Sequence, residues 1–139
     1  MPSSLNKKDF ETLSRFRYQL RRYLRFSEEA TRQSGITHLQ YQLLLHIRGF
    51  PGREWATVSE LAERLQAHHH GAVSLISRCE KLNLVKRQTG RHDRRSVEVH
   101  LTDKGNKILN DLVAQHREEL LRMQGIFHVP GAHDLDTDD

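Results

Sequence analysis

Hydrophobic residues recur every three or four positions over three long stretches of this 139-residue chain. This spacing places apolar side chains on one face of a helix and leaves polar ones on the other. It predicts a long amphipathic helix over residues 8–33, a shorter one that begins after Thr37, and a third over residues 102–123. Thr37 and Thr102 are typical residues to precede a helix, because their hydroxyl groups accept a hydrogen bond from a backbone amide of the first turn.

The middle of the chain changes from helical spacing to the alternation of a strand. Thr57 followed by Glu60 is a capping-box pattern, which predicts the start of a short helix. A second helix is predicted over residues 69–82 after a brief turn. Strands are predicted over 84–89 and 96–101, with a turn between them. Two helices joined by a turn and followed by a hairpin are the elements of a winged helix-turn-helix.

The second strand of this hairpin shows the alternation most clearly. Val97, Val99 and Leu101 are apolar, whereas Glu98 and His100 lie between them. A period of two is typical of a strand with one buried face. We therefore expect the apolar side chains to face the core, and Glu98 and His100 to face solvent.

The predicted fold class is mainly α with a small β-hairpin wing (α+β), in one domain over residues 1–139. The winged lobe would span 36–101. The terminal helices over 8–33 and 102–123 carry apolar stripes that a small winged lobe does not cover, so we expect them to serve as dimerisation helices. The tail over 128–139 contains four aspartates and no lysine or arginine, and it is predicted to be disordered.

Positive charge is concentrated around the predicted hairpin. The whole chain has a formal net charge of +4 and a pI of about 9.5. Residues 78–107 contain nine lysines and arginines but only four acidic residues. A basic surface beside a helix that fits the major groove predicts double-stranded DNA as the partner.

Composition and motifs argue against several other classes of protein. No apolar run approaches the ~20 residues that a membrane span needs, and the first residues lack the apolar core of a signal peptide. Cys79 is the only cysteine, which rules out an intramolecular disulfide and favours the cytoplasm. No P-loop, nucleophile-elbow or zinc-protease motif is present. We therefore expect no enzymatic activity, catalytic residue, cofactor or metal.

Six short segments are individually weak signals, but their order and spacing are specific. They are LQYQLLL at 39–45, TVSELA at 57–62, RCEKL at 78–82, LVKR at 84–87, DRR at 93–95 and LTDKG at 101–105. With them, the chain resembles the MarR family of transcriptional regulators over residues 8–123. The resemblance implies a cytoplasmic homodimer, usually a repressor, that a small ligand or an oxidant releases from DNA. A small aromatic or carboxylate molecule is the expected effector.

The resemblance also indicates which residues contact DNA. The candidates are His70, Ser74, Ser77, Arg78 and Lys81 in the second helix of the motif, and Arg91, Asp93, Arg94 and Arg95 in the hairpin turn. Serine and arginine are suited to reading base edges, and Lys81 is expected to meet phosphate or solvent. Asp93 would orient arginine side chains, and Arg95, with or without Arg94, would enter the minor groove. An internal salt bridge to Asp93 is an equal alternative for Arg78.

Several other residues have a structural interpretation beside a functional one. His68–His70 would contact a phosphate or base edge, or form a solvated helix start; adjacent helical residues diverge, which disfavours a shared metal ion. His116 is expected to be a satisfied core or interface histidine rather than a zinc ligand. Cys79 is expected to be buried, protonated and inert rather than a redox sensor. Phe50 and Trp55 are expected to pack from a loop over the edge of the domain.

The leading hypothesis is a dimeric, sequence-specific repressor that binds a pseudo-palindromic operator. A transcriptional activator would share every residue discussed above. A hypothesis of a different class is a winged-helix protein-interaction module that does not bind DNA specifically. The three charged residues at 93–95 argue against such a module, because it has no use for a clustered positive turn.

Overall fold

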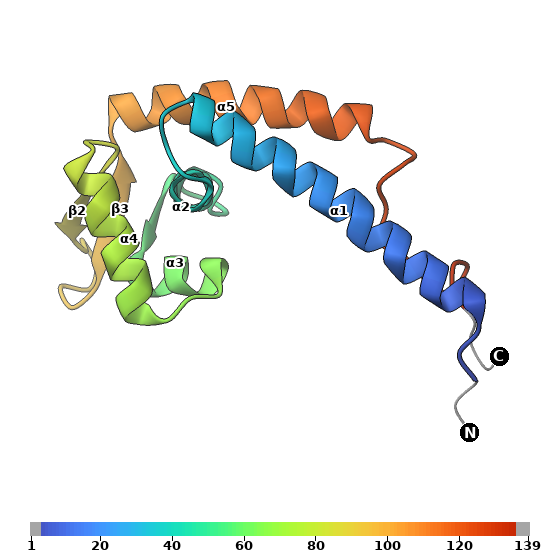
Figure 1. The fold of residues 1–139 in the computed structure, drawn as a ribbon. Coiled ribbons are helices and arrows are strands. Elements are labelled where there is room, and N and C mark those ends of the chain that lie inside the picture. The colour runs from blue at the N-terminus through green and yellow to red at the C-terminus, as the bar shows by residue number, and fades with distance from the viewer. Residues whose placement is uncertain (1–3, 136–139) are drawn as a thin grey trace.

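The computed structural model describes residues 4–135, which form five helices and one three-stranded antiparallel sheet (Figure 1). The predicted class, mainly α with a small β wing, is confirmed. In chain order the elements are α1 (Lys7–Gln33), α2 (His38–Arg48), β1 (Trp55–Thr57), α3 (Val58–Leu65), α4 (His69–Lys81), β2 (Val85–Thr89), β3 (Val97–Leu101) and α5 (Asp103–Arg122).

The helix starts follow from the capping residues that the sequence predicts. Thr37 Oγ1 accepts a bond from the Gln40 backbone amide at 3.1 Å, and Gln40 Oε1 accepts from the Thr37 amide at 2.9 Å. Thr57 and Glu60 form the same reciprocal pair at the start of α3, at 3.2 and 2.8 Å. The Thr102 hydroxyl caps α5. Each cap satisfies backbone N–H groups that have no partner within their own helix.

The core of the molecule surrounds α2. Fully buried aliphatic side chains from α2, α3, α4, α5 and the hairpin meet there: Leu43, Leu44, Ile47, Leu61, Ile76, Leu84, Val85, Val99, Leu109 and Leu112. Burial of such side chains is the main favourable contribution to folding. We call α2, α3, α4 and the sheet the lobe, and α1 with α5 the arm. Since α2 packs on both, it joins the lobe to the arm.

The sheet has the strand order β1-β3-β2. The predicted hairpin is confirmed, with Val85 opposite Leu101 and Thr89 opposite Val97. The prediction that Trp55 lies in a loop is wrong, because Trp55 begins β1 and pairs with His100. A strand of three residues is too short to show a period of two, so its partner β3 is what defines it.

The arm extends well beyond the lobe, and the N-terminal half of α1 projects away from it (Figure 1). The chain after α5 returns to this half of α1. There Phe127 stacks on Phe16 with ring centroids 5.9 Å apart, and the Thr12 hydroxyl donates to the Asp134 carbonyl at 2.9 Å. Asp134 of the predicted disordered tail thus contacts α1, and residues 136–139 fall outside the described part of the chain.

Candidate nucleic-acid interface

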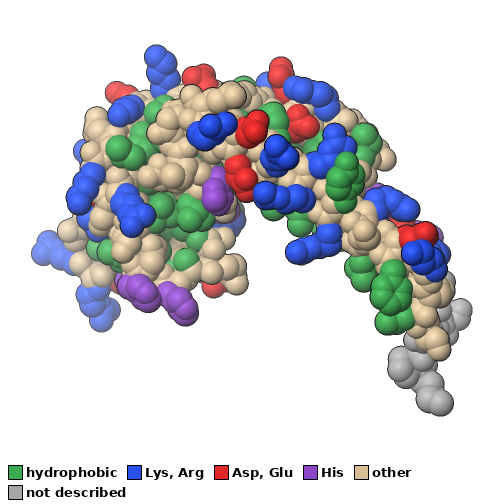
Figure 2. All heavy atoms as spheres, in the orientation of Figure 1, with side chains coloured by type: hydrophobic (Ala, Val, Ile, Leu, Met, Phe, Trp, Pro, Cys, Tyr) green, Lys and Arg blue, Asp and Glu red, His purple; other side chains and the backbone are tan. Residues whose placement is uncertain are grey.

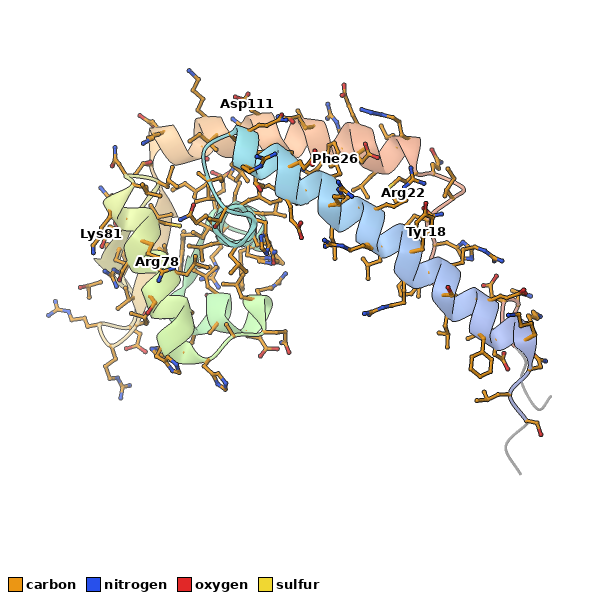
Figure 3. All side chains as sticks on the ribbon, in the orientation of Figure 1. Tyr18, Arg22, Phe26, Arg78, Lys81 and Asp111 are labelled. Carbon is orange, nitrogen blue, oxygen red and sulfur yellow. The ribbon has the colours of Figure 1, made fainter. Side chains whose placement is uncertain are left out.

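Helix α4 follows α3 after a short turn and presents one face to solvent. Its opposite face is buried through Ala72, Ile76 and Cys79. The predicted DNA-contacting side chains lie on the accessible side: His70, Ser74, Arg78 and Lys81 are exposed and Ser77 is half-buried. Figure 3 shows Arg78 and Lys81 on α4, far from the projecting half of α1. One helix face therefore carries all five side chains, and their contact with DNA stays a prediction.

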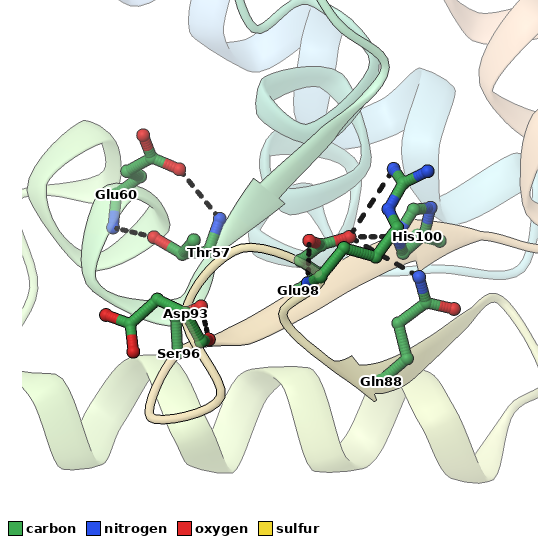
Figure 4. Close-up of polar contacts among 8 residues, drawn as sticks. Thr57, Glu60, Gln88, Asp93, Ser96, Glu98 and His100 are labelled. Atoms are coloured by element: carbon green, nitrogen blue, oxygen red, sulfur yellow. Dashed lines mark hydrogen bonds and ion pairs between the residues drawn. The ribbon is translucent and has the colours of Figure 1, made fainter.

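The loop that joins β2 to β3, residues 90–96, forms the tip of the wing and is closed by short-range hydrogen bonds. The Gly90 amide donates to the Ser96 carbonyl at 3.0 Å. The Ser96 amide and hydroxyl both donate to the Asp93 carbonyl, at 3.0 and 2.7 Å (Figure 4). A Cβ atom at Gly90 would lie 2.1 Å from Ser96 Oγ. This close approach explains why a glycine stands at the start of the loop.

Asp93 interacts with the arginine that the sequence analysis assigned to the minor groove. Its Oδ1 accepts a bond from the Arg95 amide at 3.0 Å and lies 3.5 Å from Arg95 Nε. The Arg95 side chain is nevertheless 95% exposed, and Arg94 is exposed as well. Within residues 4–135 no ion pair joins Arg78 to Asp93, so the alternative role of Arg78 as an internal partner is not realised in this structure.

Arg91 has a different environment from the other arginines of the wing loop. Its guanidinium lies 3.8 Å from Glu98 Oε1 and 5.8 Å from the centre of the Trp55 ring. Its backbone amide donates to Glu98 Oε2 at 3.2 Å. The sequence analysis grouped Arg91 with Arg94 and Arg95 as a DNA contact. In the structure it turns towards the sheet, whereas the other two project from the tip.

A hollow of about 240 Å³ separates the start of α4 from the wing. His69 lies on one wall, and Arg87 and Arg95 lie on the other. The Arg87 guanidinium also donates to Glu80 Oε1 at 2.9 Å, which holds the pKa of that carboxyl below its ordinary value; the Arg87 backbone amide adds a second bond at 3.1 Å. Helix α4, the start of α3 and the wing thus surround one concavity, and Arg87 and Arg95 are the arginines in its lining.

Basic side chains are distributed unevenly over the surface of the lobe. In Figure 2 lysine and arginine side chains project along its outer side, and histidine side chains gather at its lower edge. His68, His69 and His70 are exposed, with the rings of His68 and His70 parallel and 5.8 Å apart. Residues 4–135 contain no group of three His, Cys, Asp or Glu side chains arranged to hold a metal ion.

Two buried groups have the surroundings that the sequence predicted. His116 is 3% exposed, with Nδ1 2.7 Å from the Leu112 carbonyl and Nε2 2.9 Å from Ser27 Oγ. Its ring stacks on Tyr41, with the ring centroids 4.5 Å apart, so the core interpretation of His116 is confirmed.

Cys79 is fully buried, and this burial raises the pKa of its thiol to about 11. The thiol is therefore protonated near neutral pH, and its insensitivity to oxidants stays a prediction.

A second concavity of about 570 Å³ lies where α2 meets the arm. Most of its lining is apolar and aromatic, and includes Tyr23, Tyr41, Val113, Leu120 and Phe127. Burial raises the pKa of Tyr23, and it raises that of Tyr41 to about 12, so both phenols are neutral near pH 7. Arg117 adds a charged group to this lining, and His116, whose ring nitrogens are bonded elsewhere, also borders it. None of the described helices is both long enough and apolar enough to cross a membrane.

Comparison with known proteins agrees with this architecture. Residues 34–96 match the sequence profile of the MarR family. Over 65 residues, or 47% of this chain, 38% of positions are identical to YfiV of Bacillus subtilis, an uncharacterized HTH-type transcriptional regulator. The chain spans only 41% of the length of that relative.

Solved structures share the fold over more of the chain. The structure of AbsC, a MarR family transcriptional regulator from Streptomyces coelicolor, matches with a TM-score of 0.75 and 21% identity, covering 86% of this chain and 80% of AbsC. A point mutant of S. aureus MepR bound to an oligodeoxyribonucleotide matches with a TM-score of 0.65 and 19% identity, over 81% of each chain. The lobe is thus similar in sequence to the MarR family over residues 34–96, and lobe and arm together share the fold of a MarR family regulator.

Proposed function

We propose that this chain is a transcriptional regulator that binds double-stranded DNA in a sequence-specific manner, with α4 in the major groove and the wing in the minor groove. The observation that carries the proposal is the shared concavity between the start of α4 and the wing. Its walls include His69 on α4 and Arg95 on the wing. A DNA backbone that passes between a major-groove helix and a minor-groove wing needs such a basic channel.

The chemistry of the two elements fits different parts of DNA. Arg78 and Ser74 on the exposed face of α4 have the donors that read base edges in the major groove. Arg95, which is 95% exposed and fixed at its backbone by Asp93, suits the narrow minor groove, where negative potential is concentrated. The similarity in fold to MepR, which was solved with an oligodeoxyribonucleotide, supports this mode of binding.

The proposed active form is a homodimer joined through the arm. Large apolar side chains of the arm are exposed in the single chain: Phe10, Leu13, Leu24, Val113, Leu120 and Leu121. Covering them with the same helices of a second copy removes this apolar surface from water. The two α4 helices of the dimer would then lie about 34–36 Å apart, to enter successive major grooves of a pseudo-palindromic operator.

We further propose that the protein is a repressor that a small aromatic or carboxylate molecule releases from DNA. The concavity of about 570 Å³ at the junction of α2 and the arm is large enough for such a molecule. Its aromatic walls suit a ring, and Arg117 suits a carboxylate. A ligand there would change the angle between lobe and arm, and so the distance between the two α4 helices.

Fluorescence anisotropy tests the DNA-binding proposal with the DNA upstream of the gene and a shuffled control, at ~50 and ~200 mM salt. We expect tight binding to the native DNA and much weaker binding to the shuffled one. Arg95→Ala should weaken specific binding roughly tenfold or more, because a charge-assisted contact contributes about 1.5–3 kcal/mol. Arg25→Ala is the matched control, since it removes an exposed arginine from the arm rather than the wing.

Two outcomes would overturn the proposal. Equal weak binding to both DNAs, lost at higher salt, would leave only a non-specific basic surface, and a winged protein-interaction module would then be the better explanation. If wild type binds specifically but folded Arg95→Ala binds equally well, the wing does not act in the proposed way.

A further inference from the structure

Glu98 is a buried carboxylate in the centre of the wing. It lies on β3, the middle strand of the sheet, and is 2% exposed. The alternation of the strand predicted Glu98 on the solvent face, and its side chain does lie on the opposite face from the buried Val99. That face is covered, however, by the side chains of neighbouring residues. The prediction that Glu98 faces solvent is therefore wrong.

Donors from both sides of the wing surround this carboxylate (Figure 4). His100 Nε2 lies 2.9 Å from Glu98 Oε1, and Gln88 Nε2 on β2 donates to the same oxygen at 3.4 Å. Glu98 Oε2 accepts the backbone amide of Arg91 at 3.2 Å, and the Arg91 guanidinium lies 3.8 Å from Oε1. The bond to His100 is the largest cause of the lowered pKa of Glu98, and the bonds from Arg91 and Gln88 act in the same direction.

The bond to the Arg91 amide has a geometric consequence. Arg91 is the second residue of the wing loop, so this bond fixes the direction in which the chain leaves β2. At the end of the loop, Ser96 accepts a bond from the Gly90 amide and donates two bonds to the Asp93 carbonyl. Arg95 lies between these two fixed points, and its own contacts are with the exposed Asp93. The buried carboxylate is thus the link between the sheet and the path of the tip.

We infer that Glu98 is a positioning residue for DNA binding, which holds the base of the wing loop so that Arg95 reaches the minor groove. The inference rests on the proposed function, because it names how that interface is held in place. Glu98 itself would not touch DNA. Its negative charge would also repel phosphate. Loss of the positioning should therefore weaken DNA binding, whereas loss of the charge alone should tighten it.

The test uses Glu98→Gln, which keeps the size of the side chain but removes its charge. We expect binding to the native DNA to weaken by ~5–10-fold, since the bonds that hold the loop base are charge-assisted. A charge effect alone would tighten binding. Glu63→Gln is the matched control: it removes an exposed carboxylate near the start of α4 and should leave binding unchanged or slightly tighter.

Two further measurements separate positioning from general destabilisation. Hydrogen exchange of the Arg91 amide should accelerate in Glu98→Gln, while amides in the core of α2 keep their protection. Combined with Arg95→Ala, the Glu98→Gln change should add little further loss, because the side chain that it positions is already absent. If Glu98→Gln does not fold, Gln88→Ala removes one donor, keeps the carboxylate, and should weaken binding in the same direction.

The outcomes for this inference and for the proposed function are distinct. If Arg95→Ala weakens binding while folded Glu98→Gln binds as tightly as wild type, the inference is wrong and the proposed function stands. Additive losses in the double variant would also overturn it. If wild type itself does not distinguish native from shuffled DNA, the proposed function fails, and the inference fails with it.

Discussion

Single ion pairs on the lobe affect its response to acid, and Glu80 is the clearest case. The Arg87 guanidinium and backbone amide lower the pKa of this carboxyl in the folded state. The pair therefore stabilises the fold above the ordinary glutamate pKa of ~4.3. This contribution is lost as the pH falls through the lowered pKa of the folded protein.

We expect Glu80→Gln to be less stable than wild type at pH 7, and the difference to shrink towards pH 3. Urea unfolding of both proteins at the two pH values measures this. Glu29→Gln, which changes an exposed carboxylate on α1, is the control and should differ little from wild type at either pH. A stability gap of the same size at pH 7 and pH 3 would show that the pair has no such role.

At the scale of residues, the sequence predicted which side chains would be exposed on α4 better than it predicted their partners. His70, Ser74, Arg78 and Lys81 are exposed as expected, because helical spacing determines the face on which a residue lies. The burial of Glu98 was not predictable in this way. It depends on donors from Gln88, Arg91 and His100, which the hairpin brings together.

At the scale of elements, Gly105 allows the start of α5 to lie against the backbone of Leu84, the residue that precedes β2. A Cβ atom there would lie 2.1 Å from the Leu84 carbonyl oxygen. We expect Gly105→Ala to destabilise the fold by about 1–3 kcal/mol, because the backbone of either element would have to move. Thermal unfolding followed by circular dichroism measures the loss.

Gly71→Ala is the matched control for this prediction. Gly71 lies in α4, and nothing is within 4 Å of the Cβ position. The same change should therefore stabilise α4 by up to ~1 kcal/mol, the difference in helix propensity between alanine and glycine. Equal effects at both positions would mean that the contact with Leu84 is not what makes Gly105 necessary.

The elements themselves were largely predictable, because their start signals are local. Thr57 and Glu60 form the expected capping box, and Thr37, the expected start of α2, forms a capping box with Gln40. The short strand β1 was missed, since Trp55 takes its conformation from pairing with His100, which is distant in sequence. Local patterns thus predict helices well and short strands poorly, because the hydrogen bonds of a strand are made to residues elsewhere in the chain.

At the scale of the whole molecule, the exposed apolar surface of the arm predicts self-association. Leu121 on α5 is 63% exposed. We expect wild type to sediment as a dimer and Leu121→Glu to shift the population towards monomer, because a buried charge at an apolar interface is costly. Analytical ultracentrifugation across a range of concentrations measures the shift. Gln115→Glu, which adds the same charge at an exposed polar position of α5, is the control.

If wild type sediments as a monomer at every concentration, the proposed dimer is wrong.

The sequence predicted the helices of the arm but not the path of the chain after α5. The contacts of Phe127 with Phe16, and of Asp134 with Thr12, join residues more than 100 positions apart. No periodic pattern in residues 124–135 indicates such contacts.

Helix α2 is attached to α5 at both of its ends. Near its start Tyr41 stacks on His116, and at its end the Arg48 guanidinium donates to Asn106 at 2.8 Å. The arm is long as well, since the 27 residues of α1 correspond to about 40 Å. These contacts at the two ends of α2 set the angle between lobe and arm, and so the position of the wing relative to the far end of the arm.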